Sequence, residues 1–404
     1  MNTFETLFVN AKMTDGRLVD IAVEKGAIAA IVESGDARPK AGATVDLSGA
    51  LVVPGFVEGH IHLDTSFYGD DWRPHKPCES GFNVHERVRF QAENLALAAP
   101  LRTRARDQLD LCLAQGSTRM RSHVMVDAEL GLRHVEAVLE LRDACRDLID
   151  LQLVAFPQSG VLASVGTAAL LDEAVAMGCE VVGGIDPASF DRDVEGHLAA
   201  IFDIAARRGA AVDIHLHDRG ELGCFEIERI AAWTERLGLE GRVAVSHAYA
   251  LGDASAERLA PLAETLARSG VAIMTAAPGV FAVPPVAALR AAGVTVFSGN
   301  DNIRDSWSPY GDGDMLRRAM ILGYRSGFKT DEELLMALDV VTAGGAAALG
   351  LEDYGIRVGA AADFTTLNAR HGPEAVVAVP QGRDVYRKGR LVARNGALAA
   401  APAG

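Results

Sequence analysis

The stretch that decides the fold is Val52-Val53-Pro54-Gly55-Phe56-Val57-Glu58-Gly59-His60-Ile61-His62-Leu63-Asp64. It begins with an apolar run, which is typical of a strand covered on both faces. Successive side chains of a strand point to opposite faces, so the side chains of His60 and His62 share one face. Both imidazoles can therefore aim at one point, and we expect them to form half of a metal site.

The composition is that of an ordinary globular enzyme. The 404 residues, 49% of them hydrophobic and 23% charged, suffice for one large domain and a smaller one. The net charge of −15 disfavours binding to nucleic acid or to an anionic membrane. The five cysteines are odd in number and form no C-x-x-C pair, which favours a reducing compartment. Because we find no signal peptide and no apolar run of membrane-spanning length, we expect a cytoplasmic protein.

Strand-like and helix-like segments alternate through the middle of the chain. Stretches such as Glu129–Asp147 and Asp193–Arg208 show the apolar spacing of three to four residues that is typical of helices. The strand-like runs are Leu51–His62, Thr118–Val126, Asp150–Gln158, Val181–Asp186, Ala210–His217, Arg242–Tyr249, Ala272–Pro278 and Thr295–Asp301. These β-then-α units predict an α/β fold, a (β/α)₈ TIM barrel. A doubly wound open sheet is the alternative, but no G-x-G-x-x-G motif follows the first strand.

The two ends of the chain share another pattern. Short strands separated by glycine turns occupy roughly residues 5–53, and similar strands return in Ala362–Leu367 and Asp384–Ala393. Neither end has enough apolar surface for a core of its own, so we expect the two ends to pack together. The predicted organisation is a discontinuous small β-sandwich domain, residues 1–54 plus 356–404, and a barrel domain, residues 55–355.

Metal-binding side chains gather at the predicted strand ends. A lone histidine in an apolar strand is more often a core residue than a ligand, and His123 falls inside the second strand. The joint pattern is more specific, because the active residues of a TIM barrel lie at the C-terminal ends of its strands. The residues that end strands one, five, six and eight are His60, His62, His215, His217, His247 and Asp301.

This arrangement resembles the amidohydrolase superfamily over nearly the whole chain, including the motif P-G-F-V-E-G-H-I-H-L-D at residues 54–64. The resemblance implies a metal held by the strand-one pair, the strand-five histidine and the strand-eight aspartate, which are His60, His62, His215 and Asp301. A lysine ending strand four would bridge a second metal, but Val181–Asp186 contains none, so one metal per subunit is expected. Three imidazoles and a carboxylate suit Zn²⁺, with Fe²⁺ as the alternative.

Within the superfamily, the chain resembles the cytosine deaminase branch. Asp150–Gly160 is similar to that branch's strand-three motif, whose glutamine contacts the substrate, and this nominates Gln158. The branch carries H-x-x-E after strand five, where this chain reads His215-Leu216-His217-Asp218. This H-x-H-D motif, the G-G-x-D-P after strand four and residues 301–315 are similar to the N-isopropylammelide isopropylaminohydrolase subfamily. Further candidates for substrate contact in these motifs are Asp186, Asn302 and Trp307.

The resemblance implies hydrolytic removal of ammonia or an alkylamine from a small nitrogen heterocycle, such as an N-alkylammelide-like triazine or a cytosine-like pyrimidine. A metal-activated water would attack the ring carbon, with Asp301 accepting its proton and His247 either orienting the hydroxide or stabilising the developing charge. His217 is the candidate for delivering a proton to the ring or the leaving amine. Asp218 is either a residue that orients His217 or a salt-bridged loop carboxylate. The alternatives are a cyclic amide hydrolase, which cleaves a ring C–N bond, and a non-catalytic barrel. By analogy with the superfamily, a homo-oligomer is expected.

Overall fold

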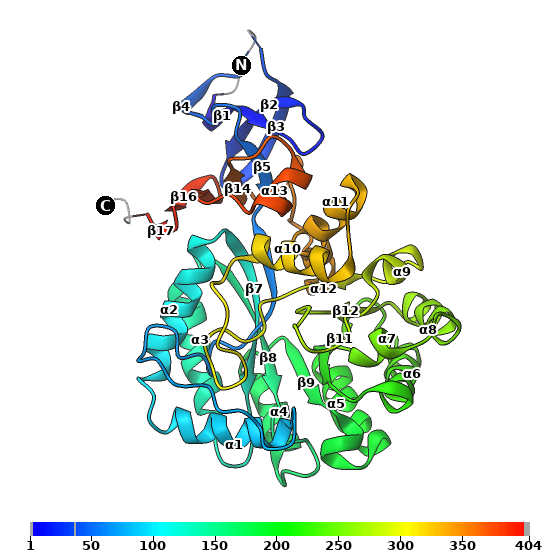
Figure 1. Cartoon of the computed structure of the whole chain (residues 1–404). Helices are drawn as coiled ribbons and strands as arrows, with labels where there is room; N and C mark the ends of the chain where they lie inside the picture. Colours follow the sequence, from blue (N-terminus) through cyan, green and yellow to red (C-terminus); the bar gives the residue numbers. More distant parts are fainter. Residues whose placement is uncertain (1–2, 36–37, 400–404) are drawn as a thin grey trace.

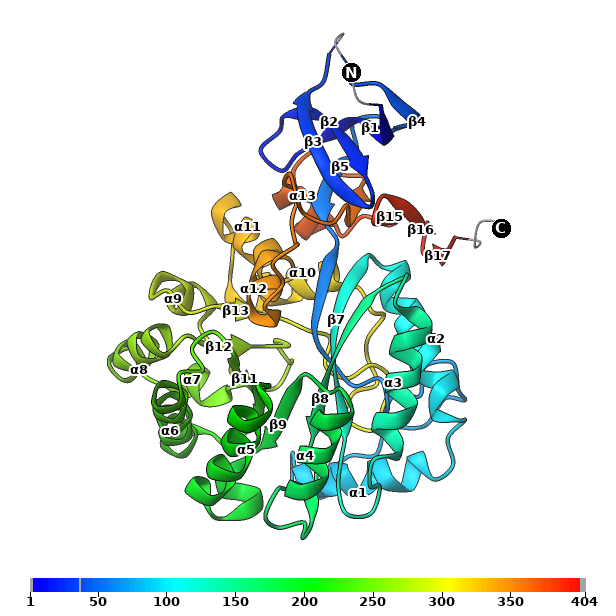
Figure 2. The same ribbon diagram turned by 180° about the vertical axis from the view of Figure 1, so that it is seen from behind.

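The computed structural model describes residues 3–35 and 38–399 and contains a barrel and a separate sheet. Figure 1 shows the barrel strands surrounded by helices, and Figure 2 shows the same molecule from behind. In both views, the blue N-terminal strands and the red C-terminal strands lie together at one end of the molecule. The two ends of the chain therefore meet, as the sequence predicts.

The barrel is a sheet of parallel strands in chain order. Within the described residues it consists of β6 Phe56–Ile61, β7 Ser117–Met125, β8 Asp150–Phe156, β9 Val181–Ile185, β10 Ala211–Leu216, β11 Val243–His247, β12 Val271–Met274 and β13 Val296–Phe297. A backbone bridge between Ile61 and Asp301 closes the ring, and the Asp301 N–H donates to the His60 carbonyl at 2.8 Å. This confirms the predicted (β/α)₈ barrel.

Helices alternate with these strands, and glycines end several of them. Gly178, Gly209 and Gly270 have φ angles of 123°, 70° and 62° at the ends of α4, α5 and α8, where glycine permits the positive φ that commonly ends a helix. The helices are α1 Val84–Leu95, α2 Leu101–Ala114, α3 Arg133–Cys145, α4 Thr167–Met177, α5 Val194–Arg208, α6 Gly220–Leu237, α7 Tyr249–Asp253, α8 Ala256–Ser269, α9 Val286–Ala291, α10 Met315–Ser326, α11 Asp331–Val340, α12 Ala343–Leu349 and α13 Gly372–Ala378, with a π-helical turn, η1, at Pro187–Asp191.

The second sheet combines both ends of the chain. Its strands are β1 Phe4–Lys12, β2 Leu18–Glu24, β3 Ala27–Glu33, β4 Ala41–Asp46, β5 Leu51–Pro54, β14 Phe364–Leu367, β15 Asp384–Arg387, β16 Arg390–Arg394 and β17 Ala397–Leu398. The join is the antiparallel pair of β5 and β14. The sheet is mixed, because β4 pairs with β1 in parallel, and the edge-to-face rings of Phe8, Phe364 and Tyr386 pack within its core.

The predicted strand Leu51–His62 is in fact two strands that belong to different sheets. The break falls at Gly55, between β5 and β6. A β-carbon on Gly55 would lie 2.2 Å from Thr118 Oγ1, so the chain can pass between the two sheets only with a glycine there.

The terminal sheet is attached to the amino ends of the barrel strands. Arg119, near the start of β7, forms a 2.5 Å ion pair with Asp363, and Arg387 contacts both Asp363 and Asp150. Both arginines are 1% exposed and Asp363 is 3% exposed, so their contacts with Asp363 are buried ion pairs, whereas Asp150 is half-exposed. The carboxyl ends of the barrel strands stay free for a functional site. Of the helices described, none combines the length and the apolar character needed to cross a membrane.

Candidate active site

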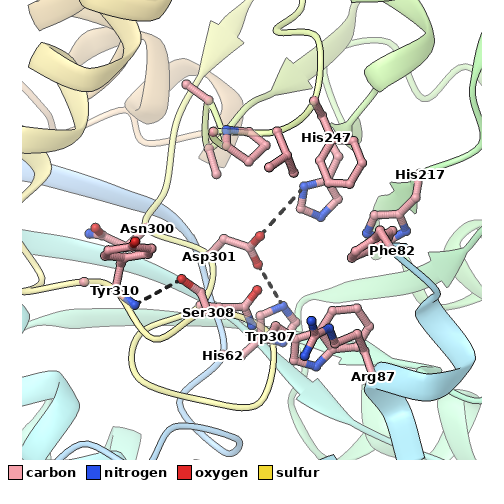
Figure 3. Close-up of a pocket in the computed structure, with 18 of the residues that line it drawn as sticks. His62, Phe82, Arg87, His217, His247, Asn300, Asp301, Trp307, Ser308 and Tyr310 are labelled. Atoms are coloured by element: carbon pink, nitrogen blue, oxygen red, sulfur yellow. Dashed lines mark hydrogen bonds and ion pairs between the residues drawn. The ribbon is translucent and has the colours of Figure 1, made fainter. Parts of the chain in front are cut away.

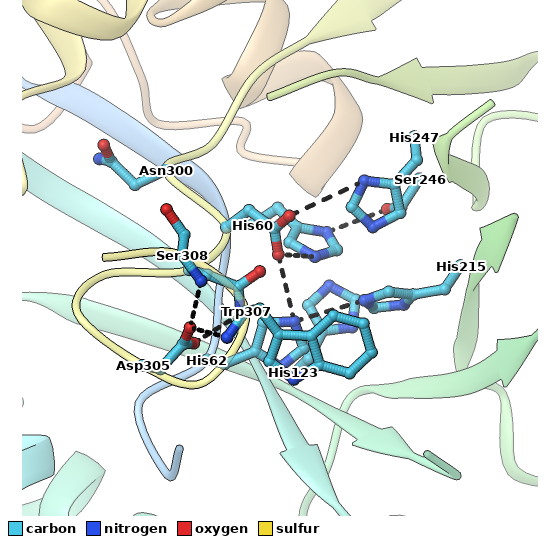
Figure 4. A network of polar contacts seen from close by, with 12 residues as sticks. His60, His62, His123, His215, Ser246, His247, Asn300, Asp305, Trp307 and Ser308 are labelled. Carbon is cyan, nitrogen blue, oxygen red and sulfur yellow. Dashed lines mark hydrogen bonds and ion pairs between the residues drawn. The ribbon is translucent and has the colours of Figure 1, made fainter. Parts of the chain in front are cut away.

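The strand ends bring the predicted metal ligands together. His60 and His62 come from β6, His215 from β10, and Asp301 follows β13. His60 Nε2 lies 3.5 Å and His62 Nε2 lies 3.4 Å from Asp301 Oδ1, and the Nε2 atoms of His62 and His215 are 3.4 Å apart. Figure 3 shows Asp301 between His62 and His247, and Figure 4 shows His60, His62 and His215 close together.

The spacing of these atoms fits a metal ion. Zn²⁺ ligands at 2.0–2.1 Å in a tetrahedron lie about 3.4 Å from one another. Within residues 3–35 and 38–399, the buried His60 Nε2 has no hydrogen-bond partner, as expected of an atom that is a metal ligand. The donor set of three imidazoles and one carboxylate is also that of a divalent metal site. The four residues that were predicted as ligands are thus suitably placed to hold one metal.

The ionisation of the cluster also suits a metal. Burial lowers the pKa of His60, and burial with the neighbouring imidazoles lowers the pKa of His215 well below its ordinary value. Burial alone would raise the pKa of Asp301, but the histidines around it, His247 first, hold that pKa well below the usual range. Burial acts to lower the pKa of His62, but the hydrogen bond and charge of Asp301, together with the charges of Asp64 and Asp305, outweigh burial and raise that pKa. Most of the cluster is therefore neutral imidazole facing a carboxylate, as metal ligands must be.

His217 is held beside the cluster by Asp186. Asp186 Oδ2 accepts a 2.7 Å hydrogen bond from His217 Nδ1, and Asp186 Oδ1 accepts one of 2.5 Å from the His217 backbone N–H. Asp186 itself has a left-handed φ of 30°, and its N–H donates to the His215 carbonyl. Because Nδ1 is engaged, Nε2 is the His217 atom left for the cavity. The carboxylate that contacts the His217 ring is Asp186, whereas Asp218 Oδ1 accepts from the Ser189 hydroxyl.

His247 lies between His217 and Asp301. Its ring stacks on that of His217 at a centroid distance of 4.6 Å and an angle of 23°, and its Nδ1 is 3.9 Å from Asp301 Oδ2. Neither ring nitrogen has a hydrogen-bond partner in the part of the chain that the structure describes, and the side chain is 2% exposed. Burial lowers the pKa of His247 well below its ordinary value, so a neutral imidazole with a free nitrogen faces the site.

The cluster opens into a cavity of about 1220 Å³, which has room for a small heterocycle. Aromatic side chains form much of its wall, with Phe281 stacked on Tyr249 at 4.5 Å and in edge-to-face contact with Phe82 at 5.0 Å. The aromatic lining residues are Phe82, Phe156, Tyr249, Phe281, Trp307 and Tyr310. Flat apolar walls beside a group of histidines are suited to a planar ring.

The four predicted substrate contacts differ in their surroundings. Gln158 and Trp307 line the cavity and are linked through Gln91, whose Nε2 donates to Gln158 Oε1 at 2.7 Å and whose Oε1 accepts from Trp307 Nε1 at 2.6 Å. Asn302 also lines the cavity, with its Nδ2 donating to Asp305 at 2.6 Å. Asp186 is buried with its carboxylate on His217, so a direct contact of Asp186 with substrate stays a prediction.

Two polar residues next to the site, His123 and Gln91, were not among the candidates predicted from the sequence. His123 is fully buried, with its ring centroid 3.9 Å from that of His60. Gln91 comes from α1, a helix whose sequence holds no motif that points to the site. The signal for His123 was present, because Arg121 and His123 share one face of β7 and a charged residue on a buried strand needs a partner inside the barrel.

The sequence model of the amidohydrolase family matches residues 43–399. The chain therefore belongs to the amidohydrolase family, and it is a hydrolase acting on carbon–nitrogen bonds other than peptide bonds, of the cyclic amidine deaminase type.

The chain is similar over most of its length to individual proteins whose names describe hydrolysis of a nitrogen heterocycle. The chain is 34% identical to N-isopropylammelide isopropyl amidohydrolase of Pseudomonas sp. (strain ADP), over 88% of this chain and 89% of that protein. N-isopropylammelide isopropylaminohydrolase from Burkholderia multivorans ATCC 17616 is 40% identical and superposes with a TM-score of 0.92, over 98% of this chain and 100% of that one. 5-Methylcytosine deaminase from Klebsiella pneumoniae, in a complex with 5-fluorocytosine, is 28% identical with a TM-score of 0.84, over 96% of this chain and 97% of that one.

Proposed function

We propose that this protein is a metal-dependent hydrolase that removes an amine from a ring carbon of a small nitrogen heterocycle. An N-alkylammelide-like triazine is the first candidate substrate, and a cytosine-like pyrimidine is the second. The relatives that are 34% and 40% identical to this chain act on N-isopropylammelide by name, which supports the triazine. The pyrimidine rests on the more distant 5-methylcytosine deaminase, which is 28% identical. We further propose Zn²⁺ as the metal, with Fe²⁺ as the alternative.

The observation on which the proposal depends is the position of His217. Its ring is held through Nδ1 by Asp186 and stacks on His247 at the wall of an aromatic cavity. Release of an amine from an aromatic ring carbon needs a proton at a ring nitrogen or at the leaving nitrogen. A histidine with one nitrogen anchored and the other directed to the cavity is suited to deliver it, because its pKa lies near neutrality.

The residues around the metal site have distinct tasks in this proposal. A bound divalent metal would supply the Lewis acidity that lowers the pKa of a water toward neutrality. The Asp301 carboxylate faces the ligand imidazoles with Oδ1 and His247 with Oδ2, so Oδ2 can accept the proton that the water loses. His247 can donate a hydrogen bond to the negative charge that develops on the attacked ring. His217 then protonates the leaving nitrogen as the exocyclic C–N bond breaks.

A second group of residues holds the ring. Gln158 lines the cavity with its Oε1 already engaged by Gln91, so its amide nitrogen is the group available to a ring carbonyl or ring nitrogen. Trp307, fixed by its own hydrogen bond to Gln91, provides a flat apolar surface near this amide. A planar, polar-edged heterocycle satisfies both groups, whereas an extended apolar chain would leave the amides without partners.

The test is a substrate panel with the full-length protein loaded with Zn²⁺ or with Fe²⁺. N-isopropylammelide, cytosine, 5-methylcytosine and a pterin are offered, and isopropylamine or ammonia is measured. We expect amine release from at least one member, with N-isopropylammelide as the best substrate. Ring opening of a cyclic amide without amine release would instead support a cyclic amide hydrolase, and a metal-loaded protein inactive on every ring would support a non-catalytic barrel.

The variant His217→Ala tests the role of the proton donor. We expect turnover to fall by about 10²- to 10⁴-fold, the range usual for general acid–base catalysis, with metal content unchanged. The matched control is His371→Ala, which removes a histidine at the N-terminus of α13, away from the barrel. Loss of bound metal from His217→Ala would contradict the assignment of His217 as a non-ligand.

A further inference from the structure

A chain of buried polar groups leads from His60 away from the cavity and through the barrel interior. His60 Nδ1 lies 3.0 Å from Ser246 Oγ, and Ser246 Oγ donates to Asp213 Oδ1 at 2.7 Å. The other carboxylate oxygen, Asp213 Oδ2, accepts from Arg121 Nη1 at 2.9 Å. The four side chains come from β6, β11, β10 and β7, and all are buried. Figure 4 shows the first contact of this chain, between Ser246 and His60.

The hydrogens in this chain can be placed by counting donors. Asp213 is paired with a guanidinium, so it is a carboxylate and can only accept hydrogen bonds. Ser246 has a single hydroxyl hydrogen, and at 2.7 Å that hydrogen is committed to Asp213. Ser246 Oγ must therefore accept from His60, which places a hydrogen on His60 Nδ1. A neutral imidazole has one ring hydrogen, so His60 Nε2 is left with a free lone pair.

The free Nε2 faces the metal site. It lies 3.5 Å from Asp301 Oδ1 and has no hydrogen-bond partner among the residues described. Without the contact to Ser246, the nearby Asp301 carboxylate would favour the opposite tautomer, with the hydrogen on Nε2, and that tautomer cannot bind a metal. The partner on the far side of the ring therefore decides whether His60 is ready to act as a ligand.

Arg121 holds this series of hydrogen-bonded side chains in place. Its Nη1 binds Asp213, its Nε donates to Gln152 at 2.7 Å and its Nη2 donates to the Ala348 carbonyl at 3.2 Å. His123 approaches the same carboxylate oxygen, with Nε2 3.8 Å from Asp213 Oδ2, so Oδ1 is left to Ser246. A buried ion pair is a weak means of gaining stability, since desolvation offsets the attraction. Because the Arg121–Asp213 ion pair lies behind His60, a proposed metal ligand, it can instead serve to orient that ligand.

We infer that Ser246 and Asp213 are positioning residues that fix His60 in the Nδ1-protonated tautomer and so set the affinity of the metal site, with Arg121 holding Asp213 as the acceptor. The inference rests on the metal-binding part of the proposed function and does not depend on the substrate. A partner of this kind typically changes metal affinity by about 10- to 100-fold.

The first variant is Ser246→Ala, which removes the hydroxyl and little volume. We expect the dissociation constant for Zn²⁺ to rise by about 10- to 100-fold. The second variant, Asp213→Asn, keeps the shape but presents a donor to Ser246. The serine hydroxyl can then turn and donate to His60 Nδ1, which selects the wrong tautomer, so we expect a larger loss. The matched control is Ser298→Ala, another buried barrel serine, whose hydroxyl donates to the Thr275 carbonyl at 2.6 Å.

The measurements use the full-length protein and Zn²⁺ alone. Competition with a chromogenic chelator gives the dissociation constant, the melting temperature of the metal-free protein reports folding, and nitrogen NMR of ¹⁵N-histidine-labelled protein reports the His60 tautomer. Weaker Zn²⁺ binding by Ser246→Ala with unchanged binding by Ser298→Ala supports the inference. Equal affinity of Ser246→Ala and the unaltered protein, an equal loss in the control, or a His60 hydrogen found on Nε2 would each overturn it. Since no substrate is present, failure of the proposed reaction leaves these results unaffected.

Discussion

The contact between Asp186 and His217 makes the most specific prediction. Asp186→Asn preserves the size of the side chain, and asparagine tolerates the left-handed backbone at this position, where φ is 30°. The amide oxygen can still accept from the backbone N–H groups of His217 and Asp218, which now bond to Asp186 Oδ1. The amide nitrogen cannot accept from His217 Nδ1, so only the orienting contact to the imidazole is lost.

The size of the effect follows from that one contact. A hydrogen bond to a charged group contributes about 1.5–3 kcal/mol, so the population of correctly oriented His217 should fall by about 10- to 150-fold. We therefore expect kcat for amine release to fall by that factor, with KM and metal content unchanged. The matched control is Asp193→Asn at the N-terminus of α5, where asparagine caps a helix as well as aspartate does.

The same variant has a defined effect on pH dependence. Burial acts to lower the pKa of His217, but the Asp186 carboxylate outweighs it and raises that pKa. If protonated His217 is the acid, activity is lost as pH rises through this pKa. Removing the carboxylate lowers the pKa, so the alkaline limb of the kcat profile should move to lower pH. An increase in KM with kcat and its pH profile unaltered would refute this reasoning and show that Asp186 contacts the substrate instead.

Three further predictions concern stability. Burial raises the pKa of Glu226 from 4.5 to about 8, so the folded state keeps a proton that the unfolded state loses, and stability should fall as pH rises from about 4.5 to 8. Glu226→Gln should remove this loss. In urea unfolding, the variant should therefore gain up to about 5 kcal/mol of unfolding free energy at pH 9 relative to the unaltered protein, and none at pH 4. Arg383→Ala leaves the buried Asp314 carboxylate without its bidentate partner. This variant should lower the unfolding free energy by about 3–5 kcal/mol in the same assay. A loss below about 1 kcal/mol would contradict a stabilising role for the Arg383–Asp314 pair. Chelation of the metal should lower the calorimetric melting temperature, since a metal present at 100 times its dissociation constant contributes about 2.7 kcal/mol, and an unchanged temperature would argue against a bound metal.

The fold could be predicted from the sequence because its signals are local and repeated. The barrel follows from strand and helix periods, and glycines mark helix ends at Gly178, Gly209 and Gly270. The break at Gly55 has a local signal in Pro54-Gly55, but the apolar runs on both sides of it hide that signal. The close approach of Thr118, a residue distant in sequence, explains why the position is a glycine, and this contact could not be predicted from the local sequence.

The cluster of side chains suited to hold a metal could be predicted for the same reason, whereas the groups that orient these side chains could not. His60 and His62 show the two-residue period of one strand face. The partner of His217 is Asp186 from the neighbouring strand end, rather than Asp218 from its own, and nothing in the local sequence distinguishes the two carboxylates. His247 has a φ of 73°, which breaks the alternation of the strand, so that His247 lines the cavity while its neighbour Ser246 contacts His60 inside the barrel.

His60 and His217, the proposed metal ligand and the proposed acid, are both oriented through a hydrogen bond at Nδ1. His60 is held at Nδ1 through Ser246 and Asp213, and His217 is held at Nδ1 by Asp186, so each leaves Nε2 for the site. The difference lies in what each carboxylate does. Asp186 touches its imidazole directly and raises the pKa of His217, as an acid requires. Asp213 acts through a neutral hydroxyl, which fixes the tautomer of His60 while burial still lowers its pKa, as a metal ligand requires. In the proposed function, the serine between Asp213 and His60 is therefore what distinguishes the environment of the metal ligand, His60, from that of the acid, His217.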